Sequence, residues 1–401
     1  MRFAFWMAAP AALAIAATGF ASPAAADEER VIKIAGFGAN SGVVRVFGVN
    51  AWATLQAARD KINEEGGVTL ADGSKAMVEV SFYDDRCNAE EGISVVRRIA
   101  SDDYLTAIGP TCSNVAEPLY GILQARVDDD SDTGLQFPIF TDVAIKGGLA
   151  QISDWAFRNV PSEAQMYDEL LGWLKEQNPE LETLYGGVEE DFAHSNATWY
   201  AVMKEKAPEH GYDVVGEAQW LLNDTNFATQ VRQMRRADPD VVAISAHPFT
   251  TCGVLREMSR QNVQPQVVIG LTSSSSLETL TGCATEAEGM IIPTSFAPVN
   301  PEAEATAQLV DDYGGSLDLH SASAWENMMI LRDVIEDAGI EGTADSLEQD
   351  RRRLRDALAG LTATDGLLGV SQRTPEGEAI KPYVFVHARD GNWEVLYEPA
   401  M

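Results

Sequence analysis

Short runs of β-branched and aromatic residues alternate with helix-forming segments along most of the chain, and this alternation constrains the fold more than any other feature. A representative helical segment is 51–63, where Trp52, Leu55 and Ile62 recur on one face. Strands that alternate with helices form parallel sheets with helices packed on both faces. The pattern therefore predicts an α/β fold of doubly wound parallel sheets. The strand-like runs are 31–35, 77–82, 105–109, 137–140, 183–187, 214–220, 241–245 and 267–270.

The alternation breaks near Pro161 and again near Pro293, which indicates two lobes rather than one sheet. A length of 401 residues also favours two domains. After the second break come helical stretches at 322–338 and 346–359 and a hairpin-like segment at 383–396. Two such lobes place a ligand at the carboxyl ends of their strands, in the crevice between them. The expected division is 27–159 plus 293–365 for the first lobe and 160–292 plus 366–401 for the second.

The first 26 residues have the pattern of a secretory signal peptide. Arg2 precedes an apolar stretch that ends in three alanines, at 24–26, before an acidic run. The alternative is an N-terminal membrane anchor, but Pro10 and Gly19 interrupt the apolar stretch. Cleavage after Ala26 would export the chain, and the simplest compartment is the periplasm of a Gram-negative bacterium.

The charge balance excludes some partners. Lys and Arg number 29 against 61 Asp and Glu, so the formal net charge is −32. Such a field repels nucleic-acid phosphates and anionic membrane surfaces, so neither is an expected partner. A hydrophobic content of 45% likewise argues against disorder.

The chain has four cysteines, at positions 87, 112, 252 and 283. Export to an oxidising compartment favours disulfides, and four cysteines allow three pairings. Sequential pairing would stabilise the fold by about 3 kcal/mol for each loop that it closes. Four free, buried thiols are the alternative. Their spacing does not match a structural zinc site.

Motifs of catalysis and of cofactor binding are missing from the sequence. Residues 36–42 follow a strand but read G-x-G-x-x-x-G, so a plain glycine turn is favoured over a dinucleotide site. There is no G-x-S-x-G, H-E-x-x-H or P-loop motif. The acidic groups at 84–85 and 189–191 are interpreted as solvated loop charges, and 272–276 as a polar loop. We therefore expect no cofactor and no bound metal.

The clearest candidate site is segment 111–114, between a strand and a helix. Backbone N–H groups at a helix N-terminus, together with the Ser113 hydroxyl, suit a carboxylate. The alternative is that Ser113 only caps its own helix. His194 and His247 each follow a strand of the second lobe, where side chains reach the crevice. They are interpreted as ligand contacts, with metal ligation or ordinary loop positions as alternatives.

Taken together, these features resemble the periplasmic solute-binding proteins of ABC importers, in the branched-chain amino-acid class. The resemblance covers the whole chain after the signal peptide. It implies two α/β lobes joined by three crossings, the type I periplasmic binding fold, which closes on its ligand. It also implies a disulfide between Cys87 and Cys112, and we extend the sequential pairing to Cys252 and Cys283 as a hypothesis. The motifs that carry the resemblance are 32–35, 41–42, 47–48, 57–67, 83–87, 108–113, 239–242 and 287–290.

The resemblance also implies ligand-binding positions. Ser113 would receive the ligand carboxylate, and Thr272 stands where the family has the acid that binds the ligand ammonium. A buried ammonium without a charge partner is costly, so either Asp142 replaces that acid or the ligand is not a standard α-amino acid. Arg45 could instead meet a second carboxylate. The remaining implied contacts are Phe47, Asp142, Ala144, His194 and His247.

The function implied is that of an exported receptor, not an enzyme, that delivers a small organic ligand to ABC permease subunits of the inner membrane. We expect a monomer. A sensory module that presents the same fold to a receptor kinase or chemoreceptor is the alternative. A hydrolase on a similar scaffold is a third possibility, for which the sequence shows no nucleophile–base pair.

Overall fold

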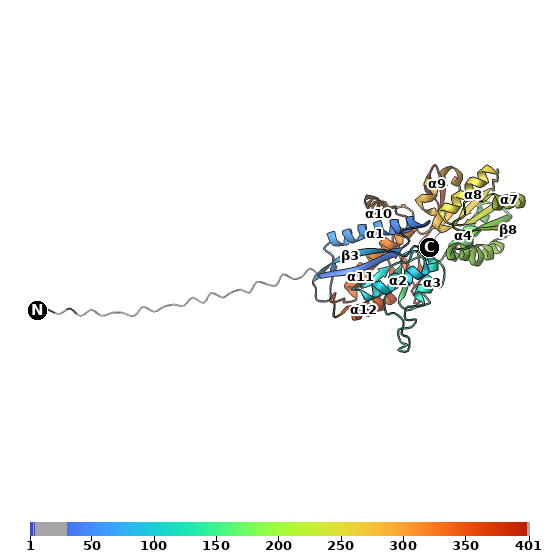
Figure 1. Cartoon of the computed structure of the whole chain (residues 1–401). Coiled ribbons are helices and arrows are strands. Elements are labelled where there is room, and N and C mark those ends of the chain that lie inside the picture. The colour runs from blue at the N-terminus through green and yellow to red at the C-terminus, as the bar shows by residue number, and fades with distance from the viewer. Residues whose placement is uncertain (3, 5–29, 399–401) are drawn as a thin grey trace.

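The computed structural model describes residues 1, 2, 4 and 30–398. Apart from three of its residues, the expected signal peptide at 1–26 lies outside this part of the chain. Figure 1 shows two lobes side by side, one labelled by α1, β3 and α11 and the other by α7, α8 and α9. None of the described helices is both long and apolar enough to cross a membrane.

Lobe 1 is built on a six-stranded sheet with the order β2-β3-β1-β4-β5-β6. Its strands run parallel except at β2, which pairs antiparallel with β3. The strands are β1 (Arg30–Gly38), β2 (Val68–Thr69), β3 (Lys75–Asp84), β4 (Thr106–Ile108), β5 (Ile139–Thr141) and β6 (Ala156–Arg158). The helices are α1 (Arg45–Glu64), α2 (Ala89–Ser101), α3 (Ser113–Tyr120), α10 (Pro301–Asp312), α11 (Leu319–Asp337) and α12 (Leu347–Gly360).

Lobe 2 is built on a seven-stranded sheet with the order β16-β15-β11-β10-β9-β7-β8. It is parallel from β8 to β11, and the C-terminal hairpin adds antiparallel strands. The strands are β7 (Thr183–Glu189), β8 (Asp213–Trp220), β9 (Val241–Ser245), β10 (Val267–Gly270), β11 (Ile291–Thr294), β15 (Val384–Arg389) and β16 (Asn392–Tyr397). The helices are α4 (Glu163–Gln177), α5 (Ala193–Ala197), the π-helix η1 (Thr198–Met203), α6 (Lys204–Lys206), η2 (Ala207–His210), α7 (Ala228–Ala237), α8 (Pro248–Arg260), η3 (Thr272–Ser275) and α9 (Leu277–Ala287).

The chain crosses between the lobes three times: from β6 to α4, from β11 to α10, and from α12 to β15. The expected two-lobe α/β fold with three crossings is therefore confirmed. The third crossing carries a small sheet of β12 (Ala363–Thr364), β13 (Ser371–Arg373) and β14 (Ala379–Ile380). This sheet packs on lobe 1, where the Arg158 N–H donates to the Gly377 carbonyl at 3.1 Å. The chain joins the lobe 2 sheet only at β15, later than the division at 366 anticipates.

The expected strands agree with the structure to within a few residues, and the hairpin at 383–396 is present as β15 and β16. The helices differ more. Helix α1 begins at Arg45, not at 51. Gly48 in its first turn packs closely on the preceding loop, and its N–H donates to the Ala39 carbonyl at 3.1 Å. The β-branched residues and the glycine of that first turn weaken the helical signal in the sequence. Helix α10 and strand β6 were not expected.

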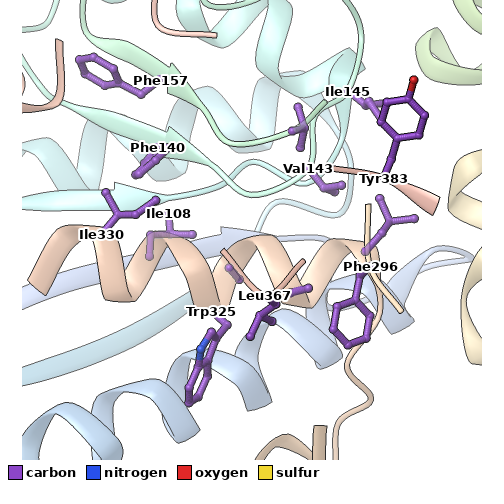
Figure 2. Close-up of a cluster of buried hydrophobic side chains, with 14 of the residues drawn as sticks. Ile108, Phe140, Val143, Ile145, Phe157, Phe296, Trp325, Ile330, Leu367 and Tyr383 are labelled. Atoms are coloured by element: carbon purple, nitrogen blue, oxygen red, sulfur yellow. The ribbon is translucent and has the colours of Figure 1, made fainter. Parts of the chain in front are cut away.

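Apolar side chains form three clusters. One lies in lobe 1 under α2 and α3, and one lies in lobe 2 under α7, α8 and α9. The largest cluster continues from lobe 1 into lobe 2. Figure 2 shows part of it: Phe140 and Phe157 of the sheet lie on one side of α11, and Trp325 of that helix lies on the other. The lobes thus share apolar packing at the crossings.

A buried carboxylate holds the crossings against α11. Glu326 accepts hydrogen bonds from the Asn159 side chain at 2.9 Å and from the Leu367 N–H at 2.9 Å. It also forms an ion pair with Lys381, and both side chains are buried. Burial lowers the pKa of the Lys381 ammonium, an effect that the Glu326 carboxylate opposes. One side chain of α11 therefore contacts the first crossing and two points of the third.

Two disulfides fix loops of the two lobes. Cys87 is joined to Cys112, which links the loop after β3 to the start of α3. Cys252 is joined to Cys283, which links α8 to α9. The structure has the sequential pairing.

Replacement of Glu326 tests the importance of this crossing cluster. We expect Glu326→Gln to lower the free energy of unfolding by about 3–5 kcal/mol, because it leaves the Lys381 charge buried without a counter-charge. The double variant Glu326→Gln/Lys381→Met should recover part of that loss. Urea unfolding measures both.

Asp333→Asn is the control on the same helix. Asp333 pairs with Arg332 at the surface, so its loss should change stability by less than about 1 kcal/mol. Equal effects of Glu326→Gln and Asp333→Asn would contradict a special role for the buried pair.

Candidate ligand-binding cleft

A small cavity lies between the lobes, at the carboxyl ends of the central strands. We call it the central cavity. Its free volume is about 10 Å³, roughly the space of one water molecule. A larger molecule can enter only if the lobes separate or the lining side chains move. Lobe 1 contributes Phe47, Thr111, Cys112, Ser113, Val143 and His320, and lobe 2 contributes Phe192, His194, His247 and Ser273.

The lobe 1 wall offers hydrogen-bond donors. Helix α3 begins at Ser113. The Val115 and Ala116 N–H groups of its first turn donate to the Cys112 carbonyl, whereas those of Ser113 and Asn114 have no partner among the described residues. The buried Ser113 hydroxyl accepts a hydrogen bond from the Lys146 N–H at 3.2 Å. Its own hydrogen has no acceptor among the described residues and remains available for donation. This wall suits a carboxylate or another anion.

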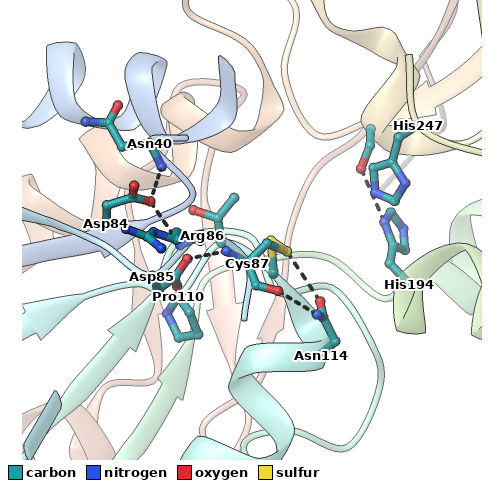
Figure 3. The surroundings of a disulfide bond; sticks show 12 residues. Asn40, Asp84, Asp85, Arg86, Cys87, Pro110, Asn114, His194 and His247 are labelled. Carbon is teal, nitrogen blue, oxygen red and sulfur yellow. Dashed lines mark hydrogen bonds between the residues drawn. A yellow bond between two sulfur atoms is a disulfide. The ribbon is translucent and has the colours of Figure 1, made fainter. Parts of the chain in front are cut away.

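The lobe 2 wall carries two imidazoles, each held by a buried carboxylate. Nε2 of His194 lies 2.8 Å from Glu163, and Nδ1 of His247 lies 2.5 Å from Glu189. His194 follows β7 and His247 follows β9, so the parallel strands bring the two rings to 5.7 Å. Figure 3 shows this pair across from the Cys87–Cys112 loop. Each carboxylate fixes the orientation of its ring.

The carboxylates behind the rings have other partners as well. Glu189 also accepts from the Thr250 hydroxyl at 2.6 Å. Burial alone would raise the pKa of Glu189, but His247 and Thr250 hold it below its usual range. Glu163 accepts from Thr198 and from Thr272 in addition to His194. Both acids are therefore occupied within the protein.

A third imidazole and two phenyl rings complete the cavity. His320, at the start of α11, stacks on Phe47 with ring centroids 3.9 Å apart. Its Nδ1 lies 3.4 Å from Asp318, which caps α11. The ring centroids of Phe192 and His247 lie 4.2 Å apart. Three of the chain's five histidines thus line the central cavity, each beside an acid.

Two acids that the sequence suggested were solvated are in fact buried. Glu189 and Asp85 are both 0% exposed. The sequence places them at strand ends, but it does not show that the following loops fold over them. Burial raises the pKa of Asp85 to about 7, even though its carboxylate accepts a hydrogen bond from the Cys87 N–H at 2.8 Å.

The neighbouring Asp84 is different. Burial alone would raise its pKa, but hydrogen bonds from Ser41 and from the N–H groups of Asn40 and Arg86 hold it below the usual range. Figure 3 shows the two acids side by side, with Asp84 facing Asn40 and Asp85 facing Cys87. Adjacent carboxylates in the chain therefore have opposite pKa shifts.

Four of the eight side chains expected to bind ligand line the central cavity: Phe47, Ser113, His194 and His247. Arg45 lines a larger cavity beside it. The other three lie behind the wall. The Thr272 hydroxyl donates to Glu163 at 2.7 Å, and the next residue, Ser273, lines the cavity in its place.

Asp142 and Ala144 are part of the supporting layer. Asp142 accepts hydrogen bonds from the Thr111 hydroxyl at 2.9 Å and from the Val143 N–H at 2.7 Å. Burial raises its pKa to about 6. The Ala144 carbonyl accepts from Arg158 at 3.1 Å. Asp142 is therefore committed to the loop and is not placed to meet a ligand ammonium.

Sequence reasoning missed Phe192, Ser273 and His320. His320 was missed because the helix was expected to begin at 322, although Asp318 and Ser321 form a capping box that marks an earlier start. Sequence reasoning also found no nucleophile–base pair. The structure places the Ser273 hydroxyl 3.2 Å from Nδ1 of His194, whose other nitrogen meets Glu163. Across the described residues, no three His, Cys, Asp or Glu side chains are arranged to hold a metal ion.

Comparison with known proteins identifies a family. A family model described as "Periplasmic binding protein" matches residues 31–392. A Leu/Ile/Val-binding protein homolog from Brucella melitensis is 24% identical over 332 residues, which are 82% of this chain and 84% of that protein. A binding protein for leucine, isoleucine, valine, threonine and alanine from Pseudomonas aeruginosa is 33% identical over 114 residues. That alignment spans only 28% of either chain.

Solved structures agree on the fold. A leucine-binding protein from Thermotoga maritima superposes with a TM-score of 0.77 at 18% identity, covering 92% of this chain and 99% of that one. A solute-binding protein from R. palustris in complex with benzoate gives 0.77 at 15% identity, covering 92% and 97%. At these identities the likeness establishes the two-lobe architecture and no more.

The pKa shift of Asp85 predicts how stability depends on pH. Because the folded state binds this proton more tightly than the unfolded chain, Asp85 contributes stability at acidic pH that is lost as pH rises from about 4 through about 7. Between pH 5 and pH 8 that loss is about 2.6 kcal/mol. Asp85→Asn removes the titrating carboxyl group. The free energy of unfolding of this variant should therefore fall less than that of the wild type between pH 5 and pH 8. Urea unfolding at several pH values measures the difference.

Asp84→Asn is the matched control. Its pKa lies below the interval, so the variant should keep the wild-type slope between pH 5 and pH 8 even if its overall stability changes. Parallel pH profiles for wild type and Asp85→Asn would show that Asp85 does not titrate there.

Proposed function

The chain belongs to the periplasmic binding protein family, and from that premise we propose that it is a receptor that captures a small organic ligand between its lobes and delivers it to an ABC importer. The observation that carries the proposal is the central cavity, whose walls come from both lobes. Ser113 and the α3 N-terminus lie on one side and His247 and His194 on the other. A ligand bound there would join the lobes.

Lobe closure follows from this geometry. A free volume of about 10 Å³ cannot admit an organic acid, so entry requires the lobes to separate about the three crossings. A ligand that contacts both walls favours the closed arrangement because it makes more contacts there than in an open one. Selectivity would come from a few polar groups in a desolvated cleft.

The names of related proteins support a small organic acid as the ligand. Curated relatives are named for leucine, isoleucine and valine, and two structural neighbours hold benzoate and 4-hydroxybenzoate. Among the described residues no free carboxylate lines the central cavity to receive an ammonium, and Glu163 behind the wall is occupied by its own hydrogen bonds. We infer that the ligand is a carboxylate without the standard α-amino group.

The partners and the compartment are part of the same proposal. Delivery requires permease subunits in the inner membrane, and export through the expected signal peptide would place the receptor in the periplasm. Family membership supports both.

One observation favours a second candidate. Ser273, His194 and Glu163 stand in the order of nucleophile, base and orienting acid. A hydrolase would release product from an ester or amide, and Ser273→Ala would abolish that turnover. Saturable binding without product would dismiss this candidate.

A thermal-shift screen of the mature protein with branched-chain amino acids, aromatic acids and dicarboxylic acids tests the receptor function. A true ligand at about 100 times its Kd should add about 2.7 kcal/mol to the free energy of unfolding. If no compound of these classes raises Tm, the proposed function is wrong.

Calorimetry with the best compound then tests the site. We expect Ser113→Ala and His247→Ala each to weaken binding about tenfold or more, because Ser113→Ala removes a hydroxyl donor and His247→Ala removes a polar contact of the lobe 2 wall. His387→Ala is the control, since His387 lies beside Glu394 at the C-terminal hairpin. Unchanged affinity in both cleft variants would exclude this placement of the ligand.

A further inference from the structure

A second, larger cavity opens beside the central one, and we call it the side chamber. Its volume is about 470 Å³, within the range of small-molecule sites. Residues 43–47 of lobe 1 form one wall, and α8 and α9 of lobe 2 form the other. Cys252, which is bonded to Cys283, lies in the lobe 2 wall. Of the two cavities between the lobes, the side chamber is therefore the larger.

The side chamber adjoins the central cavity. Phe47 and His247 line both spaces. Nδ1 of His247 is bonded to Glu189, while its Nε2 has no hydrogen-bond partner among the described residues. Because Phe47 and His247 stand between the two spaces, a molecule extends from one into the other once the Phe47 ring moves aside.

Most of the side-chamber lining is apolar. Val43, Val46, Pro248 and Phe249 contribute to it. Phe249 is 51% exposed and Val43 is 42% exposed, which is unusual for large apolar side chains. Exposed apolar side chains gathered around a hollow mark a binding surface. The middle of the chamber thus suits a hydrocarbon or aromatic segment.

The charged residues of the lining are two arginines and one acid. Arg45 comes from lobe 1 and Arg256 from lobe 2. Arg256 donates to the Gly282 carbonyl, and neither guanidinium forms an ion pair with a carboxylate of the described chain. Two such arginines at one cavity stand out in a chain of net charge −32.

The acid is Glu278, and it weakens this positive potential only in part. One of its oxygens is buried without a hydrogen-bond partner. Burial and the nearby Asp318 raise its pKa, and it is a single carboxyl facing two guanidinium groups. The chamber therefore combines an apolar middle with a cationic edge.

We propose that the ligand is an elongated dicarboxylate, with one carboxylate at Ser113 and the α3 N-terminus, an apolar spacer passing Phe47 into the side chamber, and the second carboxylate at Arg45 and Arg256. This inference rests on the proposed receptor function and narrows its ligand class. Arginine suits the distal end because its planar guanidinium binds a carboxylate through two parallel hydrogen bonds.

Calorimetry with compounds of defined length tests the inference. The probes are the linear dicarboxylates succinate, adipate and suberate, and the monocarboxylates hexanoate and octanoate, with benzoate and leucine as compounds that need only the central cavity. We expect adipate or suberate to bind at least about tenfold more tightly than the monocarboxylate of equal length. Succinate, the shortest of the dicarboxylates, should lack this advantage.

Two variants, Arg45→Gln and Val43→Trp, test where the second carboxylate and the spacer bind. Arg45→Gln should weaken the longer dicarboxylate about tenfold and leave the equally long monocarboxylate unchanged. Arg97→Gln is the matched control, because Arg97 is an exposed arginine of α2 and the substitution changes net charge equally. Val43→Trp should fill the chamber and weaken suberate while succinate or benzoate binding stays the same.

The outcomes separate this inference from the function on which it rests. If leucine or benzoate binds and no dicarboxylate does, the receptor function stands and the inference fails. If dicarboxylates bind but Arg45→Gln and Arg97→Gln have equal effects, the second carboxylate lies elsewhere and the inference also fails. If none of the probes binds, the ligand class is wrong, and the thermal-shift screen decides the receptor function separately.

Discussion

The buried Glu326 carboxylate is the interaction on which the arrangement of the lobes depends. It meets Asn159 of the first crossing and Leu367 and Lys381 of the third, so segments far apart in sequence are held at one point of α11. The same helix carries His320 at its N-terminus, against Phe47 in the cleft. Helix α11 thus carries both the side chain that holds the crossings and a residue of the cavity wall. A movement at the crossings therefore also changes the lining of the central cavity.

Histidines replace free acids on the walls of the cleft. Glu163, Glu189 and Asp318 lie behind the imidazoles, where hydrogen bonds satisfy them, and Nε2 of His247 is left without a partner among the described residues. A wall of this kind keeps negative charge away from a bound anion. The net charge of −32 therefore says little about the cleft itself. Local pairing, not composition, sets the chemistry that a ligand would meet.

The sequence predicted the sheets well because buried parallel strands are short apolar runs with little ambiguity. It predicted the cleft less well. Thr272 and Ser273 are adjacent and both polar, and only the path of η3 decides which of them faces the cavity. Asp85 and Glu189 sit in acidic runs that look solvated, because burial depends on loops that pack over them from elsewhere in the chain. His320 comes from a helix far along the sequence, which no local pattern connects to Phe47.

The cross-link between α8 and α9 bears on how a molecule would leave. Because Cys252 and Cys283 are bonded, the lobe 2 wall of the side chamber moves as a single body, whereas residues 43–47 travel with the other lobe. The side chamber therefore lies at the interface along which the two lobes separate. Separation of the lobes would therefore expose a long ligand to solvent along its whole length at once, so the ligand would not have to pass end-first through a narrow exit. On this geometry a long ligand need not dissociate more slowly than a short one.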